Sequence, residues 1–215
     1  MFGKNKISNI VPQGGDYLDV VEIFPTIQGE GPLSGMPAIF IRLGGCNLKC
    51  KFCDTEFDNY RTLSLSQIIA QISETKVPQT KLIVITGGEP LRQPIKKLCN
   101  LLIENDYMVQ VETNGTILRK LPEQVTIVCS PKIVNNSYNI TNELMEYADC
   151  FKFLVESKGK YSIVPKRDFT KPVFIQPIDS YNKKTNEENM AYATDLALRN
   201  NYRLSLQIHK ILNIK

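Results

Sequence analysis

Hydrophobic residues recur along this chain in short runs that have the length of β-strands. The runs are rich in Val, Ile and Phe, and several are too continuously apolar to leave one face in water. Such runs are typical of parallel strands that are covered on both faces. We predict strands over residues 17–24, 38–43, 81–86, 108–112, 126–129, 150–155, 173–176 and 203–207.

Helical patterns fall between the predicted strands. Apolar residues spaced by three and four predict a helix after Ser64, which is a suitable N-cap. A second apolar face follows Pro94, which we expect in the first turn of its helix. Thr185 and Glu188 have the spacing of a capping box, which predicts a helix that continues through Arg199.

Strands that alternate with helices indicate an α/β fold built from right-handed βαβ units. The helical patterns are fewer than the strands, and a complete eight-unit barrel needs about 250 residues. We therefore predict a partial (open) TIM-type barrel of parallel strands with outer helices. Residues 17–215 are predicted to form a single domain. Residues 1–16 form a polar N-terminal extension, which we expect to be loose or to cover the edge of a dimer.

Composition and charge narrow the class of protein. The 215 residues are 42% hydrophobic and 22% charged, as in ordinary globular proteins, and the net charge of +4 is spread along the chain. We expect neither direct nucleic-acid binding nor a membrane partner, because the basic residues do not cluster and no apolar run reaches about 18 residues. The N-terminus lacks the apolar stretch of a secretory signal, so we expect a cytoplasmic protein with reduced thiols.

Three of the six cysteines lie close together, as Cys46, Cys50 and Cys53, in the pattern C-x3-C-x2-C. Structural zinc and iron sites normally close with a fourth protein ligand, so three thiolates leave one coordination position open for chemistry. The alternative is a zinc site completed by His209 or Asp54. The other three cysteines lie in apolar patterns and are interpreted as small buried side chains: Cys99, Cys129 and Cys150.

Glycine-rich and polar segments follow several predicted strands, at residues 86–90, 112–115, 130–132 and 176–179. Ligands of such folds gather at the carboxyl ends of the strands, so these segments are expected to line one rim. The cysteine pattern followed by Gly-Gly-Glu-Pro at 87–90 resembles the radical S-adenosylmethionine superfamily. The resemblance implies a radical SAM core, with the three cysteines holding a 4Fe–4S cluster whose fourth iron binds S-adenosylmethionine. One electron then yields a 5′-deoxyadenosyl radical, without catalytic residues beyond the cluster and cofactor.

A narrower resemblance rests on Gln-Gly-Glu-Gly at 28–31 and Leu-Gln-x-His-Lys at 206–210, and extends over the chain from about Tyr17. In these segments the chain is similar to the 7-carboxy-7-deazaguanine synthase family. The resemblance implies a lyase that converts 6-carboxy-5,6,7,8-tetrahydropterin to 7-carboxy-7-deazaguanine with release of ammonia, in queuosine biosynthesis and tRNA modification. It also implies Mg²⁺, a reducing protein such as flavodoxin or ferredoxin, and a homodimer.

The same resemblance assigns roles to individual residues. Thr55 would be the protein ligand of Mg²⁺. The residues expected to bind the substrate are Ile27, Gln28, Gly29, Glu30, Arg42, Thr86, His209 and Lys215. The residues expected to bind S-adenosylmethionine are Phe52, Asp54, Gly88, Glu89, Ser130, Pro131, Lys132, Gln176, Pro177, Ile178 and Asp179.

The chemistry of these residue types agrees with the implied roles. Arg42 offers a planar fork that suits a substrate carboxylate, and the Gln28 amide can match a pterin edge. The Thr55 hydroxyl is a hard oxygen ligand that suits Mg²⁺. Plainer interpretations are an exposed Arg42 over a strand edge, a simple turn at residues 28–32, and a solvated strand end at Glu112. Two further alternatives for the whole chain are a glycyl-radical-activating enzyme that acts on a protein partner and a non-enzymatic zinc module.

Overall fold

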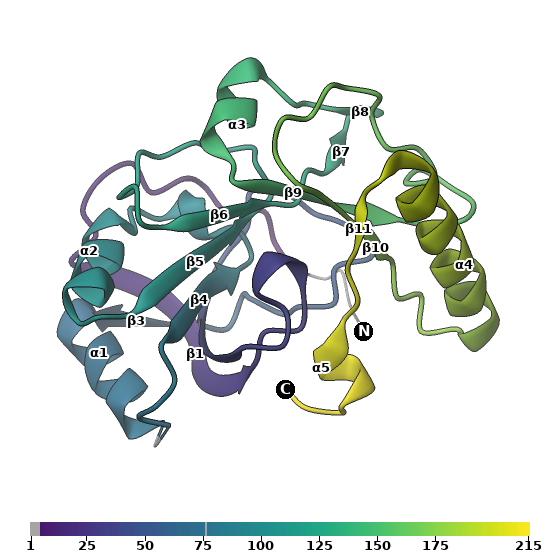
Figure 1. The fold of residues 1–215 in the computed structure, drawn as a ribbon. Helices are drawn as coiled ribbons and strands as arrows, with labels where there is room; N and C mark the ends of the chain where they lie inside the picture. The colour runs from purple at the N-terminus through teal and green to yellow at the C-terminus, as the bar shows by residue number, and fades with distance from the viewer. Residues whose placement is uncertain (1–4, 76) are drawn as a thin grey trace.

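The computed structural model describes residues 5–75 and 77–215, which form one curved sheet with helices around it (Figure 1). The strands are β1 (Tyr17–Ile27), β2 (Pro37–Leu43), β3 (Arg61–Ser64), β4 (Leu82–Gly87), β5 (Met108–Thr113), β6 (Thr126–Cys129), β7 (Ile133–Val134), β8 (Ser137–Tyr138), β9 (Cys150–Val155), β10 (Val173–Pro177) and β11 (Arg203–Leu204). The helices are η1 (Gly31–Leu33), α1 (Leu65–Glu74), η2 (Pro90–Arg92), α2 (Lys96–Glu104), α3 (Asn142–Tyr147), α4 (Lys183–Asn200) and α5 (Ile208–Ile211).

The main sheet has nine strands in the order β11-β10-β9-β6-β5-β4-β2-β1-β3. From β2 to β11 every neighbouring pair is parallel, whereas β1 runs antiparallel to both β2 and β3. Among the described residues β3 and β11 remain the two edges, so the barrel is open. Figure 1 shows α1, α2, α3 and α4 around the outside of the curved sheet, with α5 on its inside. The predicted open α/β barrel is confirmed.

The two faces of the sheet differ because side chains alternate along each strand. Odd-numbered positions such as Ile41 and Ile85 belong to the core beneath α1 and α2, and Phe153 belongs to the core beneath α3 and α4. In the parallel strands from β2 to β10, even-numbered positions point to the inside, where small apolar clusters lie near the amino ends of the strands. Toward the carboxyl ends the even-numbered positions become polar: Arg42, Thr86, Glu112, Lys152 and Gln176. The inside of the barrel is therefore the polar face.

The helices begin where local capping chemistry allows. Ser64 caps α1 and forms the full capping box with Gln67, as the sequence predicts for the N-cap. The predicted capping box at Thr185 is wrong, because Asn182 is the N-cap of α4 and accepts a hydrogen bond from the Thr185 N–H at 3.0 Å. Pro94 lies just before the N-cap Ile95 and not in the first turn of α2. None of the described helices is both long enough and apolar enough to cross a bilayer.

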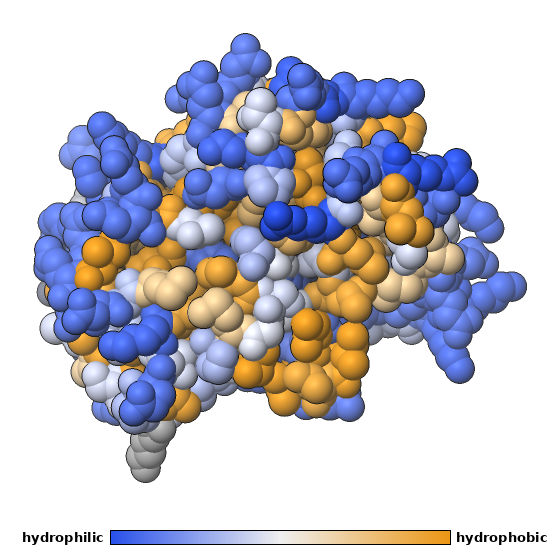
Figure 2. All heavy atoms as spheres, viewed as in Figure 1, coloured by the Kyte–Doolittle hydropathy of each residue, from blue (hydrophilic) through white to orange (hydrophobic). Residues whose placement is uncertain are grey.

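The last predicted strand, residues 203–207, is shorter than expected. Only Arg203 and Leu204 form strand pairs with β10. The Ser205 hydroxyl then accepts a hydrogen bond from the Gly31 N–H at 3.0 Å and donates one to Gln176 Oε1 at 2.9 Å. The chain continues into α5. Figure 2 shows hydrophobic side chains gathered on this face around α5, where Ile211 and Leu212 are exposed.

The described part of the N-terminal extension is not loose. Ile7 forms a parallel bridge with Cys46, and the Ser8 N–H donates to the Cys46 carbonyl at 2.7 Å. Asn5 is buried; its amide donates to the Thr55 carbonyl at 2.8 Å and accepts from the Phe57 N–H at 3.1 Å. This segment therefore packs along the cysteine loop of its own chain. Residues 1–4, which belong to the same prediction, lie outside the described residues.

Candidate active site

The cysteine loop leaves the carboxyl end of β2 through two glycines. Gly45 has φ of +78°, and a Cβ atom there would lie 2.6 Å from Nε of the Arg92 guanidinium. Only glycine fits this turn, because it tolerates positive φ and needs no room for a side chain. Cys46, Cys50 and Cys53 then line one cavity, which we call the cluster cavity.

The three thiols are set in a partly buried environment. Burial raises the pKa of Cys46 to about 11, and burial also raises the pKa of Cys50 and of Cys53. Bound iron would replace the thiol protons and supply the missing positive charge. Within the described residues no three His, Cys, Asp or Glu side chains are grouped to hold a single metal ion. Among the described residues the zinc site completed by His209 or Asp54 therefore gains no support.

The cluster cavity also collects most of the residues that the sequence assigns to S-adenosylmethionine. They come from the cysteine loop and from the ends of β4, β6 and β10: Phe52, Asp54, Gly88, Ser130, Lys132, Gln176, Pro177, Ile178 and Asp179. A Cβ on Gly88 would lie 2.8 Å from the Cys46 Cβ, so glycine lets this strand end approach the cysteine loop. The residues assigned to S-adenosylmethionine therefore surround the space next to the three thiols.

Glu89 and Pro131 do not line the cluster cavity. The Glu89 carboxylate is fully buried and accepts hydrogen bonds from the Thr113 hydroxyl at 2.8 Å and from the N–H groups of Leu91 and Asn114 at 2.9 and 2.7 Å. Burial raises its pKa to about 7. In this structure Glu89 therefore fixes two strand-end loops to each other, and the predicted contact with the cofactor has no support.

A second cavity, which we call the substrate cavity, opens beside the first. Its lining contains seven of the eight residues predicted to bind substrate, together with Thr55: Ile27, Gln28, Glu30, Arg42, Thr55, Thr86, His209 and Lys215. The missing one, Gly29, lies against His209, and a Cβ there would be only 2.9 Å from the His209 backbone nitrogen. The two cavities share Glu30, Thr55 and Thr86, so they form one continuous site.

Arg42 projects from β2 into the substrate cavity. Its Nε donates to Glu22 Oε1 at 2.9 Å, and its Nη1 donates to Thr55 Oγ1 at 3.3 Å. The side chain is 20% exposed. The interpretation of Arg42 as a surface side chain is therefore wrong. Lys215 pairs with the same Glu22, and its main-chain oxygen accepts a hydrogen bond from the Thr26 hydroxyl, which places Lys215 at the rim of this cavity.

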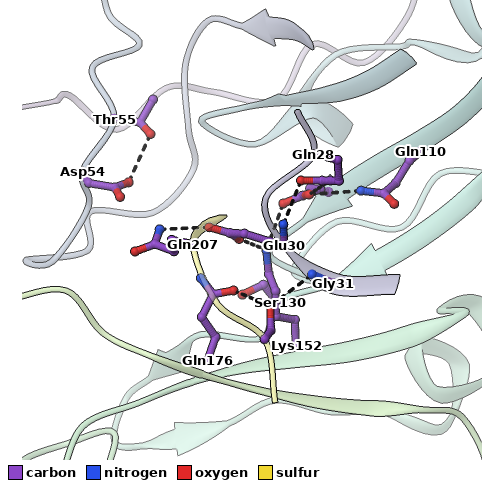
Figure 3. A network of polar contacts seen from close by, with 12 residues as sticks. Gln28, Glu30, Gly31, Asp54, Thr55, Gln110, Ser130, Lys152, Gln176 and Gln207 are labelled. Carbon is purple, nitrogen blue, oxygen red and sulfur yellow. Dashed lines mark hydrogen bonds and ion pairs between the residues drawn. The ribbon is translucent and has the colours of Figure 1, made fainter. Parts of the chain in front are cut away.

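Three charged side chains meet on the polar inner face, and Figure 3 labels two of them, Glu30 and Lys152. The Lys152 ammonium pairs with Glu30 and, at 3.0 Å, with Glu112. Burial alone would raise the pKa of Glu30, but the Lys152 charge and hydrogen bonds from Lys152 and Gln207 lower it to about 2. Burial disfavours the Lys152 ammonium, yet the two carboxylates outweigh it and raise its pKa. We call Glu30, Lys152 and Glu112 the charged triad.

The charged triad is tied to the Gln-Gly-Glu-Gly segment. Gln28 is buried, its amide donates to Glu112 Oε1 at 2.9 Å, and its Oε1 accepts from the Glu30 N–H at 3.1 Å. Gln207 donates to Glu30 Oε1 at 2.9 Å from the other side (Figure 3). Glu112 is therefore not a solvated strand end. These contacts fix the side chains that border both cavities.

Sequence reasoning did not assign roles to Lys152, Glu112, Gln207 or Lys210. Lys152 had a detectable signal, since a lysine in the middle of the apolar run 150–155 needs a partner. Lys210 joins the cysteine loop to the end of β10, because its ammonium lies 3.0 Å from both Asp54 and Asp179. No sequence pattern reveals that bridge, which depends on where α5 packs.

Comparison with known proteins agrees with this geometry. A family model described as the Radical SAM superfamily matches residues 40–155. A curated 7-carboxy-7-deazaguanine synthase from Rickettsia prowazekii is 45% identical over 225 residues, which cover 100% of this chain and 96% of that protein. Another from Rhodospirillum rubrum is 36% identical over the whole of both chains. The crystal structure of QueE from Escherichia coli matches with a TM-score of 0.74 and 26% identity, covering 89% of this chain and 94% of that one.

The open barrel, the three-cysteine loop and the matched domain define a radical S-adenosylmethionine enzyme. Within that superfamily the chain belongs to the 7-carboxy-7-deazaguanine synthase family, since full-length relatives exceed 30% identity. These relatives favour the synthase over a glycyl-radical-activating enzyme.

Proposed function

We propose that this chain converts 6-carboxy-5,6,7,8-tetrahydropterin to 7-carboxy-7-deazaguanine with release of ammonia, as a lyase of queuosine biosynthesis. The observation that carries the proposal is the substrate cavity, in which residues from β1, β2, β4 and α5 meet beside the three thiols. These residues lie far apart in the sequence and belong to the motifs that distinguish the family.

The family implies a 4Fe–4S cluster on Cys46, Cys50 and Cys53, with S-adenosylmethionine on its open iron. When bound, the pair supplies a carbon-centred radical that can take a hydrogen atom from the substrate. The protein's own contribution is to orient both molecules and to exclude water. Gly88 and Lys132, among the residues proposed to bind the cofactor, line the cluster cavity, whereas Arg42 lines the substrate cavity.

Arg42 is proposed to bind the substrate carboxylate. Its guanidinium already donates to the Glu22 carboxylate and to the Thr55 hydroxyl, so its Nη groups face the substrate cavity from a fixed position. Gln28 and Glu30 are held by the charged triad and border the same space, where they can match the donors and acceptors of a pterin edge. Burial lowers the pKa of His209, so its imidazole is neutral at neutral pH.

Mg²⁺, a protein electron donor and a homodimer are parts of the same proposal. The Thr55 hydroxyl lies 3.3 Å from Asp54 Oδ1, and both oxygens line the shared space, which supports a Mg²⁺ site there. The exposed apolar side chains around α5 in Figure 2 supply a surface that a second copy could cover. Cytoplasmic location is proposed because the thiols must stay reduced to hold iron.

The Arg42→Ala variant tests the substrate assignment. Under anaerobic conditions with reconstituted cluster, the variant should bind S-adenosylmethionine normally. Its KM for the carboxylated pterin should rise by at least about tenfold, because a charge-assisted hydrogen-bonded pair contributes about 1.5–3 kcal/mol. Arg61→Ala, at an exposed position of β3, is the matched control. An unchanged KM in Arg42→Ala would refute the assignment of Arg42 to the substrate carboxylate. An activating enzyme for a protein partner would form no deazaguanine in the wild type or in either variant, and that result would exclude the synthase.

A further inference from the structure

Cys46 differs from the other two cysteines of the loop in its surroundings. It is 7% exposed, whereas Cys50 and Cys53 are half-buried. The Leu48 N–H donates to Cys46 Sγ at 3.4 Å, and the side-chain amide nitrogen of Asn114 donates to the same sulfur at 3.9 Å. One N–H group comes from the cysteine loop itself and the other from the loop after β5. Two N–H groups therefore face the Cys46 sulfur.

These surroundings fit a thiolate that holds iron. A neutral thiol is a weak acceptor, so it gains little from two N–H groups. A thiolate gains more, because charge-assisted hydrogen bonds are about twice as strong as neutral ones. Burial raises the pKa of Cys46 to about 11, so the sulfur keeps its proton until a cation such as iron replaces it. The two donors are thus suited to the negative sulfur of a bound cluster.

The direction of the Asn114 amide is fixed by its oxygen. Asn114 Oδ1 accepts hydrogen bonds from the Thr116 N–H at 2.9 Å and from the Thr116 hydroxyl at 2.5 Å. A backbone N–H can only donate, so the amide oxygen must lie on that side and the amide nitrogen on the side of Cys46. The main-chain N–H of Asn114 is also held, by the buried Glu89 carboxylate at 2.7 Å. The amide is therefore oriented before any cluster binds.

The amide nitrogen of Asn114 has two hydrogens and two acceptors. It donates to Asn47 Oδ1 at 3.1 Å, and its other acceptor is Cys46 Sγ. Asn47 in turn donates to the Thr116 hydroxyl at 2.8 Å, so the cysteine loop is fastened to the loop after β5. Asn114 is 9% exposed. In such a buried place a fixed dipole acts more strongly than it does in water.

We propose that the side-chain amide of Asn114 raises the reduction potential of the 4Fe–4S cluster by donating a hydrogen bond to the Cys46 sulfur. The inference rests on the proposed function, which assigns that cluster to the three thiols. When an external one-electron reductant supplies one electron, no bond forms or breaks, and the negative charge on the cluster and its sulfurs increases. A donor directed at one sulfur stabilises the reduced form more than the oxidised form, and hydrogen bonds to the sulfurs help to set cluster potentials.

The test compares Asn114→Leu, which keeps the branched shape of the side chain without its amide, with the matched control Thr116→Val. The control loses the hydroxyl that bonds to Asn47 and Asn114, but it keeps the amide and the Thr116 N–H that orients it. The reduction potential of the reconstituted full-length protein is measured by an EPR-monitored titration with dithionite, without S-adenosylmethionine or pterin. Iron content and hydrogen exchange of residues 46–53 verify that both variants keep the cluster and the cysteine loop.

At the midpoint potential of the wild type, the ratio of reduced to oxidised cluster should fall about fivefold in Asn114→Leu, as expected for the loss of one hydrogen bond. For a one-electron couple at 59 mV per tenfold, this is a shift of about 40 mV to more negative potential. Thr116→Val should keep the wild-type potential. An unchanged potential in Asn114→Leu would overturn the inference. An equal shift in both variants would also overturn it, because the attachment of the loop would then set the potential.

A second variant, Asn114→Asp, decides if Asn114→Leu does not hold the cluster. Its side chain keeps an acceptor for Thr116 and places another acceptor where the amide donor was, so the potential should fall at least as far. A wild-type potential in Asn114→Asp would overturn the inference. A wild type that holds the cluster but forms no deazaguanine with dithionite would contradict the proposed function alone, since the potentials still test Asn114. A wild type that holds no cluster would contradict both.

Discussion

At the scale of single residues, Lys152 is the side chain on which the inner face depends most. It is 3% exposed and supplies the positive charge between Glu30 and Glu112. Removing one partner from a buried ion pair leaves uncompensated charge, which typically costs 3–5 kcal/mol, more than the pair itself contributes. We therefore expect Lys152→Met to lower the free energy of unfolding by about 3 kcal/mol at neutral pH.

The effect of Lys152→Met should depend on pH. In the wild type the pKa of Glu30 is about 2, below its ordinary value of 4.5, so its stabilising contribution is present above pH 4.5 and is lost as the pH falls toward 2. Without the lysine, burial raises the pKa of Glu30, and protonation of Glu30 then removes the uncompensated charge of the variant as the pH falls. In anaerobic urea unfolding, the difference in the free energy of unfolding between the wild type and Lys152→Met should narrow from pH 7 to pH 4.5. A difference that does not depend on pH would contradict this explanation, and so would a difference equal to that caused by Lys81→Met, the control at an exposed position.

At the scale of elements, α5 is a four-residue helix held over the site by side chains. The Lys210 ammonium connects it to Asp54 and Asp179, and the Ile208 N–H donates to the Gly29 carbonyl at 3.2 Å. Such a short helix has no stability of its own. Its position therefore depends on these contacts with β1, β10 and the cysteine loop.

Lys210→Gln should loosen α5 without unfolding the protein. The amides of α5 should exchange hydrogen faster, and KM for the pterin should rise several-fold, because His209 and Gln207 lose their fixed places. Global stability should change by no more than about 1 kcal/mol, since both ion pairs are partly exposed. Hydrogen exchange followed by mass spectrometry measures the first effect, with Lys183→Gln as a control on α4. Unchanged exchange in α5 would show that the bridge does not position the helix.

The strands were predictable because short, continuously hydrophobic runs are typical of buried strands and not of surface helices or loops. The cysteine loop and the strand-end loops were predictable as a group, because parallel strands bring their carboxyl ends to one rim. The strand β1 was predicted, but its antiparallel direction was not, because a hydrophobic pattern does not report strand direction. The short β3, α3 and β7–β8 hairpin were missed, since two- to six-residue elements carry little periodicity. The capping of α4 by Asn182 instead of Thr185 depends on a choice between two competent caps, which the sequence alone leaves open.

At the scale of the whole molecule, the sequence predicted which motifs meet. It did not predict how the charged side chains on the polar inner face pair with one another. Glu112 and Lys152 come from β5 and β9, and their pairing follows from strand register and from alternation toward the inside. Arg42 on β2 pairs with Glu22, which lies opposite it on β1. The packing of residues 5–8 on the cysteine loop also depends on tertiary contacts that no local sequence pattern predicts. The boundary between an extension and a single domain at residue 17 stays a prediction.

One measurement tests the central claim most directly: anaerobic turnover of the reconstituted chain with dithionite, S-adenosylmethionine, Mg²⁺ and 6-carboxy-5,6,7,8-tetrahydropterin, followed by mass spectrometry. The account predicts 7-carboxy-7-deazaguanine and ammonia in equal amounts, with more product formed than S-adenosylmethionine consumed. The same preparation of a Cys50→Ala variant should form none. A wild-type preparation with its cluster intact that yields no deazaguanine would contradict the account.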